Sequence, residues 1–214
     1  MSNDKPIIGI LGAGKLSVVL SQLAIKAGYE VYVSNSKDPA QLVLSFSVLS
    51  PGTHVVTREQ LIETANILIL ALPLSKYKTV PADTLNGKLV IDAMNYWWEV
   101  DGALEATHPL ATSSSEQVQS YFKDAVVIKA LNHIGYHDLY DHAAKPGDPN
   151  RRAVAIAGDD KNGISIVNTM VNDLGFDPLY IGTLNRGSAL EPGSNTFGAS
   201  VSIHELKKLL EYTP

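Results

Sequence analysis

The sequence predicts an α/β fold with a mainly parallel β-sheet that helices cover on both faces. Three observations support this class. Short runs rich in Val and Ile recur along the chain, amphipathic segments separate them, and each run is apolar at consecutive positions, as in strands buried on both faces. The expected strands are residues 7–11, 31–33, 67–72, 89–91, 126–128, 154–157 and 179–181.

The first of these strands, residues 7–11, runs directly into the stretch Gly12-Ala13-Gly14. A helix is expected to begin near Lys15, because apolar residues then recur at helical spacing. This pattern stops at Gly28, a typical helix terminator. Residues 7–33 are therefore predicted to form one strand–helix–strand unit.

A glycine-rich turn between a strand and a helix is typical of loops that bind the pyrophosphate of a dinucleotide. In such loops the first glycine makes the turn, the second lets the backbone approach the phosphates, and the third lets helix and strand pack closely. Gly12 and Gly14 fit the first two roles. Ser17 stands at the third position, where its hydroxyl is expected to bond to the helix backbone. The predicted phosphate-binding residues are Gly12, Ala13, Gly14, Lys15 and Leu16.

The helix that begins at this loop would point its free N–H groups and positive dipole end at the phosphates. We therefore predict a Rossmann-type doubly wound sheet, as a single domain over residues 1–214. The alternative is a strand–turn–helix in which the glycines serve only to turn the chain.

The end of the second strand favours NADP over NAD. NAD-binding proteins usually carry an acidic residue there, about 20 residues beyond the glycine loop, for the ribose hydroxyls. In this chain Glu30 lies at the wrong end of the strand, and Asp38-Pro39 is typical of a helix start. Hydroxyl, amide and ammonium donors take the acid's place, and they suit a 2'-phosphate, although a solvated polar turn has a similar composition. The predicted 2'-phosphate residues are Ser34, Asn35, Ser36 and Lys37.

Composition excludes several other classes of protein. With 214 residues, 45% hydrophobic, the chain can form a sizeable core. Its formal net charge of −5, without a Lys/Arg run, argues against a nucleic-acid partner, and the absence of cysteine excludes disulfides and thiolate metal sites. The longest apolar segment, from Ile67, is too short to span a bilayer, and the N-terminus is too polar for a signal peptide. We expect a cytoplasmic protein that binds no membrane.

The later part of the chain contains further helix starts and one long loop. Asp159 and Asp160 precede an amphipathic segment and are interpreted as helix caps, as are residues 112–115. The Pro- and Gly-rich stretch from Lys145 is expected to be a loop within the domain. From about residue 183 an irregular segment is expected, followed by a final amphipathic helix.

Several motifs in order along the chain point to one family: GILGAGKLS, VSNSK, LALPLSKY, VIDAMNYWWEVDG, VIKALNHIG, VAIAGDD and LEPGSNTFGAS. Together they resemble the NADP oxidoreductases that depend on the deazaflavin coenzyme F420, a family similar to the reductase domain of metalloreductases. The resemblance covers nearly the whole chain. It implies hydride transfer between NADP(H) and a second redox partner, and it suggests a homodimer.

The same resemblance implies roles for two strand ends. Ala71, Leu72 and Pro73 would face the phosphates and ribose of the cofactor, whereas Ala130, Leu131 and Asn132 would approach the nicotinamide. Core packing or a turn is an equal alternative for several of them. After Asn132 the chain departs from the family pattern, which leaves the acceptor open among F420, a flavin and another small molecule.

Other polar and aromatic residues are candidates for the acceptor side of the site. His133 directly follows a strand and is predicted to contact the substrate. Tyr96 and Trp97 also follow a strand, where they would stack on a planar acceptor or lie in a dimer interface. Asn95 and Asp92 are candidates for bonds to the nicotinamide side, with a structural turn as the alternative.

No acid–base dyad or metal centre is predicted. Hydride transfer between two planar rings needs mainly their orientation, so we assign no catalytic residue. His133, His137 and His142 lie near Asp138 and Asp141, but the glutamate of the zinc-protease motif is missing, and we predict no metal site. The predicted function is an NADPH-dependent oxidoreductase; the alternative is a non-catalytic NADP(H) sensor.

Overall fold

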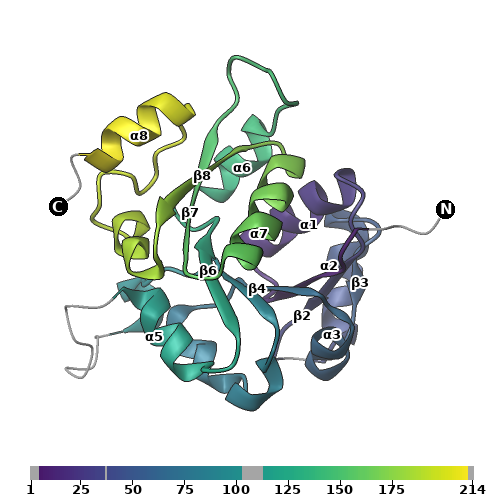
Figure 1. The fold of residues 1–214 in the computed structure, drawn as a ribbon. Coiled ribbons are helices and arrows are strands. Elements are labelled where there is room, and N and C mark those ends of the chain that lie inside the picture. Colours follow the sequence, from purple (N-terminus) through teal and green to yellow (C-terminus); the bar gives the residue numbers. More distant parts are fainter. Residues whose placement is uncertain (1–4, 37, 103–112, 212–214) are drawn as a thin grey trace.

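The computed structural model describes residues 5–36, 38–102 and 113–211 of the chain (Figure 1). Its eight strands form one sheet in the order β3-β2-β1-β4-β5-β6-β7-β8. The strands are β1 (Ile8–Leu11), β2 (Val31–Ser34), β3 (His54–Val55), β4 (Ile67–Leu70), β5 (Leu89–Asp92), β6 (Val126–Ala130), β7 (Ala153–Gly158) and β8 (Asp177–Gly182). All neighbours pair in parallel except β6 and β7. The predicted α/β class with a mainly parallel sheet is confirmed.

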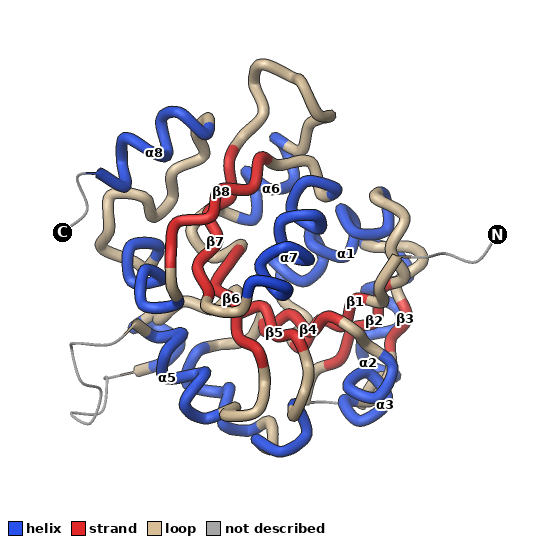
Figure 2. The backbone as a smooth tube through the Cα atoms, viewed as in Figure 1, coloured by secondary structure: helices blue, strands red, loops and turns tan. Residues whose placement is uncertain are grey.

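Helices and short 3-10 turns connect the strands and cover the sheet, which crosses the centre of the molecule (Figure 2). The α-helices are α1 (Lys15–Lys26), α2 (Ala40–Leu49), α3 (Arg58–Thr64), α4 (Trp98–Asp101), α5 (Ser114–Tyr121), α6 (Tyr136–His142), α7 (Lys161–Asp173) and α8 (Ile203–Glu211). The 3-10 turns are η1 (Leu74–Thr79), η2 (Ala82–Leu85) and η3 (Leu184–Leu190). Among the described residues, no helix is both long and apolar enough to cross a membrane.

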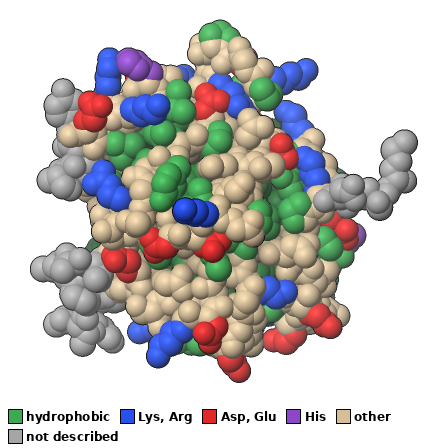
Figure 3. All heavy atoms as spheres, viewed as in Figure 1, with side chains coloured by type: hydrophobic (Ala, Val, Ile, Leu, Met, Phe, Trp, Pro, Cys, Tyr) green, Lys and Arg blue, Asp and Glu red, His purple; other side chains and the backbone are tan. Residues whose placement is uncertain are grey.

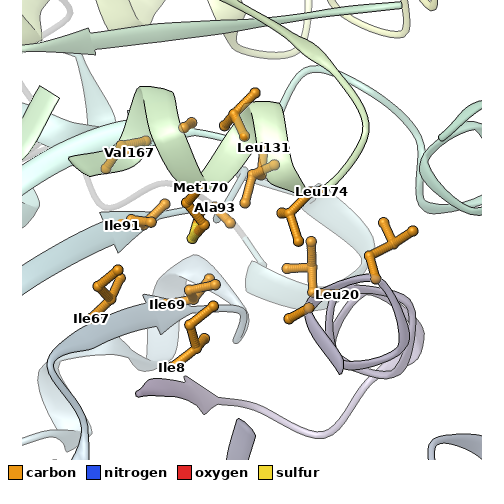
Figure 4. Packing of buried hydrophobic residues seen from close by; sticks show 14 of the residues in the cluster. Ile8, Leu20, Ile67, Ile69, Ile91, Ala93, Leu131, Val167, Met170 and Leu174 are labelled. Carbon is orange, nitrogen blue, oxygen red and sulfur yellow. The ribbon is translucent and has the colours of Figure 1, made fainter. Parts of the chain in front are cut away.

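Each face of the sheet has its own apolar core, because successive strand residues point to opposite faces. On one face, isoleucines of β1, β4 and β5 pack against α1 and α7, as Figure 4 shows for Ile8, Ile69, Leu20 and Met170. On the other face, leucines and valines of the same strands pack against α3, α5 and η1. The C-terminal helix α8 packs through Leu206 on β7 and β8.

Local capping follows the sequence at three helix starts. Asp160 caps α7 by accepting a hydrogen bond from the Gly163 amide at 2.6 Å, and Ser113 forms a capping box at α5 with Glu116. Asp38 accepts a hydrogen bond from the Ala40 amide at the start of α2. The capping predictions are confirmed for Asp160 and Ser113, and Asp38 lies at the start of α2 as expected, although the N-cap residue there is Pro39. The prediction is wrong for Asp159, whose Oδ1 accepts a hydrogen bond from the Leu184 amide at 3.1 Å instead of capping α7. Two features were not predicted: the two-residue strand β3 and the antiparallel pairing of β6 with β7.

The outer surface mixes charged and uncharged groups. On the face drawn in Figure 3, acidic and basic side chains are interspersed among apolar and neutral ones. This face therefore shows no large patch of one charge.

Candidate functional site

The glycine turn lies at the carboxyl end of β1, where it contacts both neighbouring strands. The Gly12 amide donates a hydrogen bond to the Ser34 carbonyl at 2.8 Å. Gly12 has a φ of +126°, and a Cβ added to it would overlap the carbonyl oxygen of Ala71. A side chain at this position is therefore excluded twice, by conformation and by space.

The second glycine leaves open space in front of α1. Apart from Gly14, its chain neighbours and the backbone of its own helix, no described atom lies within 4 Å of the place where a Cβ on Gly14 would stand. Gly14 is also the N-cap of α1, and no side chain of the described residues caps this helix. The first-turn amides thus remain available to an anion, as expected for a phosphate-binding loop.

Ser17 takes the place of the third glycine and is fully buried. Its Oγ has no hydrogen-bond partner among the described residues, so the prediction that it bonds to the helix backbone is wrong. The residue packs here by its small size alone. The glycine that allows a helix to approach β1 closely is Gly9. A Cβ at this position would overlap Leu61 of α3 and Ala65, which follows this helix.

A first cavity of about 250 Å³ opens at the ends of β1, β2 and β4. Its floor is the glycine turn, and one wall is the loop that follows β2. The described lining residues are Leu11, Gly12, Ala13, Gly14, Ser34, Asn35, Ser36, Arg58, Ala71, Leu72, Pro73, Lys76, Thr79 and Val80. This lining holds two basic side chains and, among the described residues, no acidic one, so the first cavity suits an anion.

A second cavity of about 640 Å³ lies at the ends of β4, β5 and β6 and continues from the first. The two share Gly14 and residues 71–73. Most of its lining is apolar or aromatic, including Met94, Trp97, Val100 and Phe197. The rings of Trp97 and Phe197 meet edge to face, with centroids 5.6 Å apart.

One cation stands where the second cavity meets the glycine turn. Lys15 lines the cavity, and its Nζ lies 5.5 Å from the ring centroid of Tyr136, in cation–π geometry. The described lining of the second cavity contains no carboxylate. Together the cavities form one crevice along the carboxyl edge of the sheet, the usual ligand position in a doubly wound fold.

Two asparagines form the polar part of the second cavity. Asn95 donates from Nδ2 to the Asn132 carbonyl at 2.7 Å, and Asn132 donates from Nδ2 to Oδ1 of Asn95 at 3.0 Å and to the Leu190 carbonyl at 2.8 Å. Oδ1 of Asn132 is buried without a partner among the described residues. It is an acceptor that a ligand amide could satisfy. Leu131, just before it, has a φ of +66°, an unusual conformation for a residue that is not glycine.

His133 lines the second cavity but is tied to the sheet. Its Nε2 accepts a hydrogen bond from the Ala155 amide of β7 at 3.0 Å, and the side chain is buried. Burial lowers the pKa of the imidazole to about 4, partly offset by the backbone of Thr196. The ring is therefore neutral at neutral pH and is not suited to general acid catalysis there.

A buried ion pair lies behind the wall of the second cavity. Lys129 Nζ lies 3.2 Å from Asp92 Oδ2, and both side chains are fully buried. Lys129 also donates to the Met94 carbonyl at 2.6 Å, while Asp92 Oδ1 accepts from the Met94 amide at 2.9 Å and Oδ2 from Ser115 Oγ at 2.6 Å. The pair thus holds both sides of the Met94 residue, whose other surface lines the cavity.

The structure brings most predicted site residues together in this crevice. Gly12, Ala13, Ser34, Asn35 and Ser36 line the first cavity; Lys15, Leu16, Asn95, Trp97, Asn132 and His133 line the second; Gly14, Ala71, Leu72 and Pro73 line both. Lys37 lies outside the described residues.

Three predicted residues lie elsewhere. Tyr96 packs against the core on the opposite face of the sheet and donates its hydroxyl to the Gly102 carbonyl at 2.7 Å. Ala130 is completely buried in the core beneath α7. The carboxylate of Asp92 accepts hydrogen bonds from Lys129, Ser115 and the Met94 amide and is therefore not free to bind a ligand. For Asp92 and Ala130 the reason is the alternation of side chains along β5 and β6, which turns them away from the crevice. Tyr96 lies in the connection after β5, where its hydroxyl bond to Gly102 holds it.

Two residues of the first cavity were missed in the sequence, Arg58 and Lys76. Arg58 begins α3 directly after β3, and Lys76 lies in η1 after β4. Arg58 could have been found only by knowing that β3 lies beside β2. The sequence gives no sign of this, because β3 has two residues and no apolar run.

The histidines of the 133–142 segment do not converge. His142 Nδ1 lies 3.3 Å from Asp138 and 3.1 Å from Ser200 Oγ, whereas His133 bonds to β7. Within the described part of the chain, no group of three His, Asp or Glu side chains could hold a metal ion.

Comparison with known proteins agrees with this geometry. Residues 7–96 match the family model described as NADP oxidoreductase, coenzyme F420-dependent, which confirms the resemblance seen in the sequence. Rat (Rattus norvegicus) metalloreductase STEAP3 is 28% identical over 190 residues, 88% of this chain but 36% of that protein. The chain therefore corresponds to well under half of this curated relative.

Solved structures show the same fold. The hypothetical protein SMa0349 from Sinorhizobium meliloti aligns with a TM-score of 0.77 at 22% identity, over 94% of this chain and 97% of that one. A candidate F420-dependent NADP reductase from Arthrobacter sp. FB24 aligns with a TM-score of 0.72 at 20% identity, over 86% and 88%. Both likenesses confirm the Rossmann-type architecture.

Proposed function

We propose that this NADP-dependent oxidoreductase transfers hydride between NADP(H), bound along the carboxyl edge of the sheet, and a planar redox partner held against the nicotinamide. The observation that carries the proposal is the pair of continuous cavities that meet at Gly14. The first cavity holds two basic side chains and the polar residues 34–36, whereas the lining of the second is mostly apolar or aromatic. This difference between the two cavities matches the two ends of NADP(H), a phosphorylated adenosine and a planar nicotinamide ring.

The glycine turn is proposed to bind the pyrophosphate. The open space at Gly14 lets the backbone approach the ligand, and the uncapped amides of α1 supply hydrogen bonds to negative oxygens. Ser34, Asn35 and Ser36 are proposed to surround the ribose 2'-phosphate, with Lys37 beside them in sequence.

The other end of the cofactor would lie in the second cavity. Asn132 is proposed to accept a hydrogen bond from the nicotinamide amide through its unpartnered Oδ1. The bound cofactor supplies the hydride. The protein supplies position: the Asn95–Asn132 pair and the strained Leu131 fix one side of the ring site.

The acceptor is proposed to be a deazaflavin or flavin. Such a ring needs orientation rather than a strong protein acid, and the second cavity offers no carboxylate among its described lining residues and a neutral His133. Trp97 and Phe197 supply apolar surface for a planar ring. Lys15 is the one charged side chain of the described lining, and it suits an acceptor that carries negative charge near its edge.

The test combines binding with turnover. Purified protein is titrated with NADPH and with NADH, and NADPH oxidation is then followed with F420, FMN, FAD and a quinone. Preferential NADPH binding and steady turnover with a ring acceptor would support the proposal. Binding without turnover across the panel would favour the sensor alternative, and equal binding of both nucleotides would remove the 2'-phosphate site.

A further inference from the structure

The first cavity is lined by two basic side chains that do not belong to the loop after β2. Arg58 and Lys76 both line it, although they come from different elements, α3 and η1. No Asp or Glu occurs among its described lining residues. Two cations around one small cavity without a counter-charge in its lining favour a ligand group with more than one negative charge.

The sheet register explains why Arg58 reaches this cavity. β3 pairs in parallel with β2, with Val55 opposite Val33, and the Val56 amide continues the ladder to the Val33 carbonyl at 3.1 Å. The chain after β3 therefore leaves the sheet beside the chain after β2. Arg58, the first residue of α3, stands next to the loop that begins at Ser34.

The Arg58 side chain is held rather than free in solvent. Its Nη1 donates to the Thr79 carbonyl at the end of η1, at 2.9 Å, and its Nε lies 3.6 Å from Oε1 of the neighbouring Glu59, whose side chain is largely exposed and does not line the cavity. One third of the Arg58 side chain is exposed. The start of α3 is fixed as well, because Thr57 and Gln60 form a capping box. A guanidinium has five N–H donors in a planar fork, so the bond to Thr79 leaves others for a phosphate.

Lys76 reaches the same cavity from a different element. It lies in η1, which follows β4, while β1 and its glycine turn lie between β4 and β2. The Lys76 amide donates to the Pro73 carbonyl at 2.9 Å, so the residue follows directly on the wall shared by the two cavities. The bond between Arg58 and Thr79 joins the two cation-bearing elements across the cavity.

We propose that Arg58 and Lys76 form the cationic half of the 2'-phosphate site, facing Ser34, Asn35 and Ser36, and that they set the preference for NADP(H) over NAD(H). This inference rests on the proposed function, because it takes the ligand of the crevice to be a dinucleotide. It assigns the discrimination to residues of α3 and η1, outside the loop after β2 where sequence reasoning placed it.

The experiment compares matched variants. Arg58→Gln and Lys76→Gln remove the two cations, and Lys78→Gln removes a cation from the same 3-10 turn whose side chain lies over Tyr77 and does not line the cavity. Dissociation constants are measured by calorimetry for NADPH and NADH. The fragments 2',5'-ADP and 5'-AMP are measured as well, because they differ only in the 2'-phosphate and do not reach the second cavity.

For Arg58→Gln we expect NADPH and 2',5'-ADP to bind about 10-fold or more weakly, because charge-assisted bonds to phosphate are lost, while NADH and 5'-AMP change by less than about twofold. Lys76→Gln should show the same selectivity with a smaller loss, and Lys78→Gln should match the wild type. Raising the salt concentration should weaken NADPH binding more in the wild type than in Arg58→Gln.

Two results would overturn the inference. Equal weakening of NADPH and NADH would show that Arg58 acts only by holding η1 through Thr79, and unchanged NADPH binding in both variants would place the phosphate elsewhere. Wild-type protein that binds neither nucleotide would instead refute the proposed function itself. Thermal unfolding of each variant shows whether a binding loss comes from loss of the fold.

Discussion

The buried imidazole of His133 makes the stability of this protein depend on pH in a calculable way. The ring is enclosed, its Nε2 accepts the Ala155 amide, and burial lowers its pKa to about 4 from 6.5. The unfolded chain therefore binds a proton before the folded one does. The contribution of this group to stability is complete above about pH 6.5 and is lost as the pH falls toward 4.

The size of the effect follows from the two pKa values. Lowering the pH from 7.5 to 5.0 should reduce the free energy of unfolding by about 2 kcal/mol through this group alone. Urea unfolding at the two pH values, followed by tryptophan fluorescence, measures the loss. The variant His133→Gln keeps an acceptor for Ala155 but does not titrate, so the difference between wild type and variant isolates the imidazole.

A matched control is His137→Gln, which removes an exposed imidazole from α6. The control should lose as much stability as the wild type between the two pH values, and His133→Gln should lose about 2 kcal/mol less. If wild type and His133→Gln lose the same amount, the ring is protonated or hydrated in the folded protein. Burial would then not lower the pKa of this imidazole.

Three other substitutions test the remaining parts of the structure. Gly12→Ala should abolish detectable NADPH binding and lower stability by about 2 kcal/mol or more, measured by calorimetry and thermal unfolding, because a Cβ overlaps the Ala71 carbonyl. Lys129→Met should cost about 3–5 kcal/mol in urea unfolding, because Asp92 is left buried without its cation, and adding Asp92→Asn should restore part of the loss. Asp160→Ala should cost about 1 kcal/mol through the lost cap of α7, with no change in NADPH affinity.

The fold was predictable where the signal is local. Apolar runs mark the buried strands, and glycine, Asp160 and Ser113 mark helix boundaries through effects that act within a few residues. Strand β3 was missed because two residues, one of them the exposed His54, carry no periodic pattern. The antiparallel direction of β7 was invisible because a strand buried on both faces reads the same in either direction.

The candidate site was likewise predictable only where its residues form a short motif beside one strand. The glycine turn and the loop after β2 were found because each is a short motif next to its strand. Arg58 was missed because its place depends on the pairing of β3 with β2. For Asp92 the structure agrees with the structural-turn alternative, because its Oδ1 accepts from the Met94 amide two residues on. Its ion pair was not predictable, since Lys129 lies directly opposite Asp92 across β5 and β6, a relation that single-strand patterns do not contain.

The second cavity brings together two segments that are far apart in the sequence, because Phe197 lies 183 residues after Gly14 and both line it. Phe197 and Gly198 line it, and the Gly198 amide donates to the His133 carbonyl at 2.6 Å. These two segments meet only in the folded chain. A ligand that fills the second cavity would contact both of them at once, so its binding free energy would stabilise the fold that holds them together and would protect both segments from proteolysis.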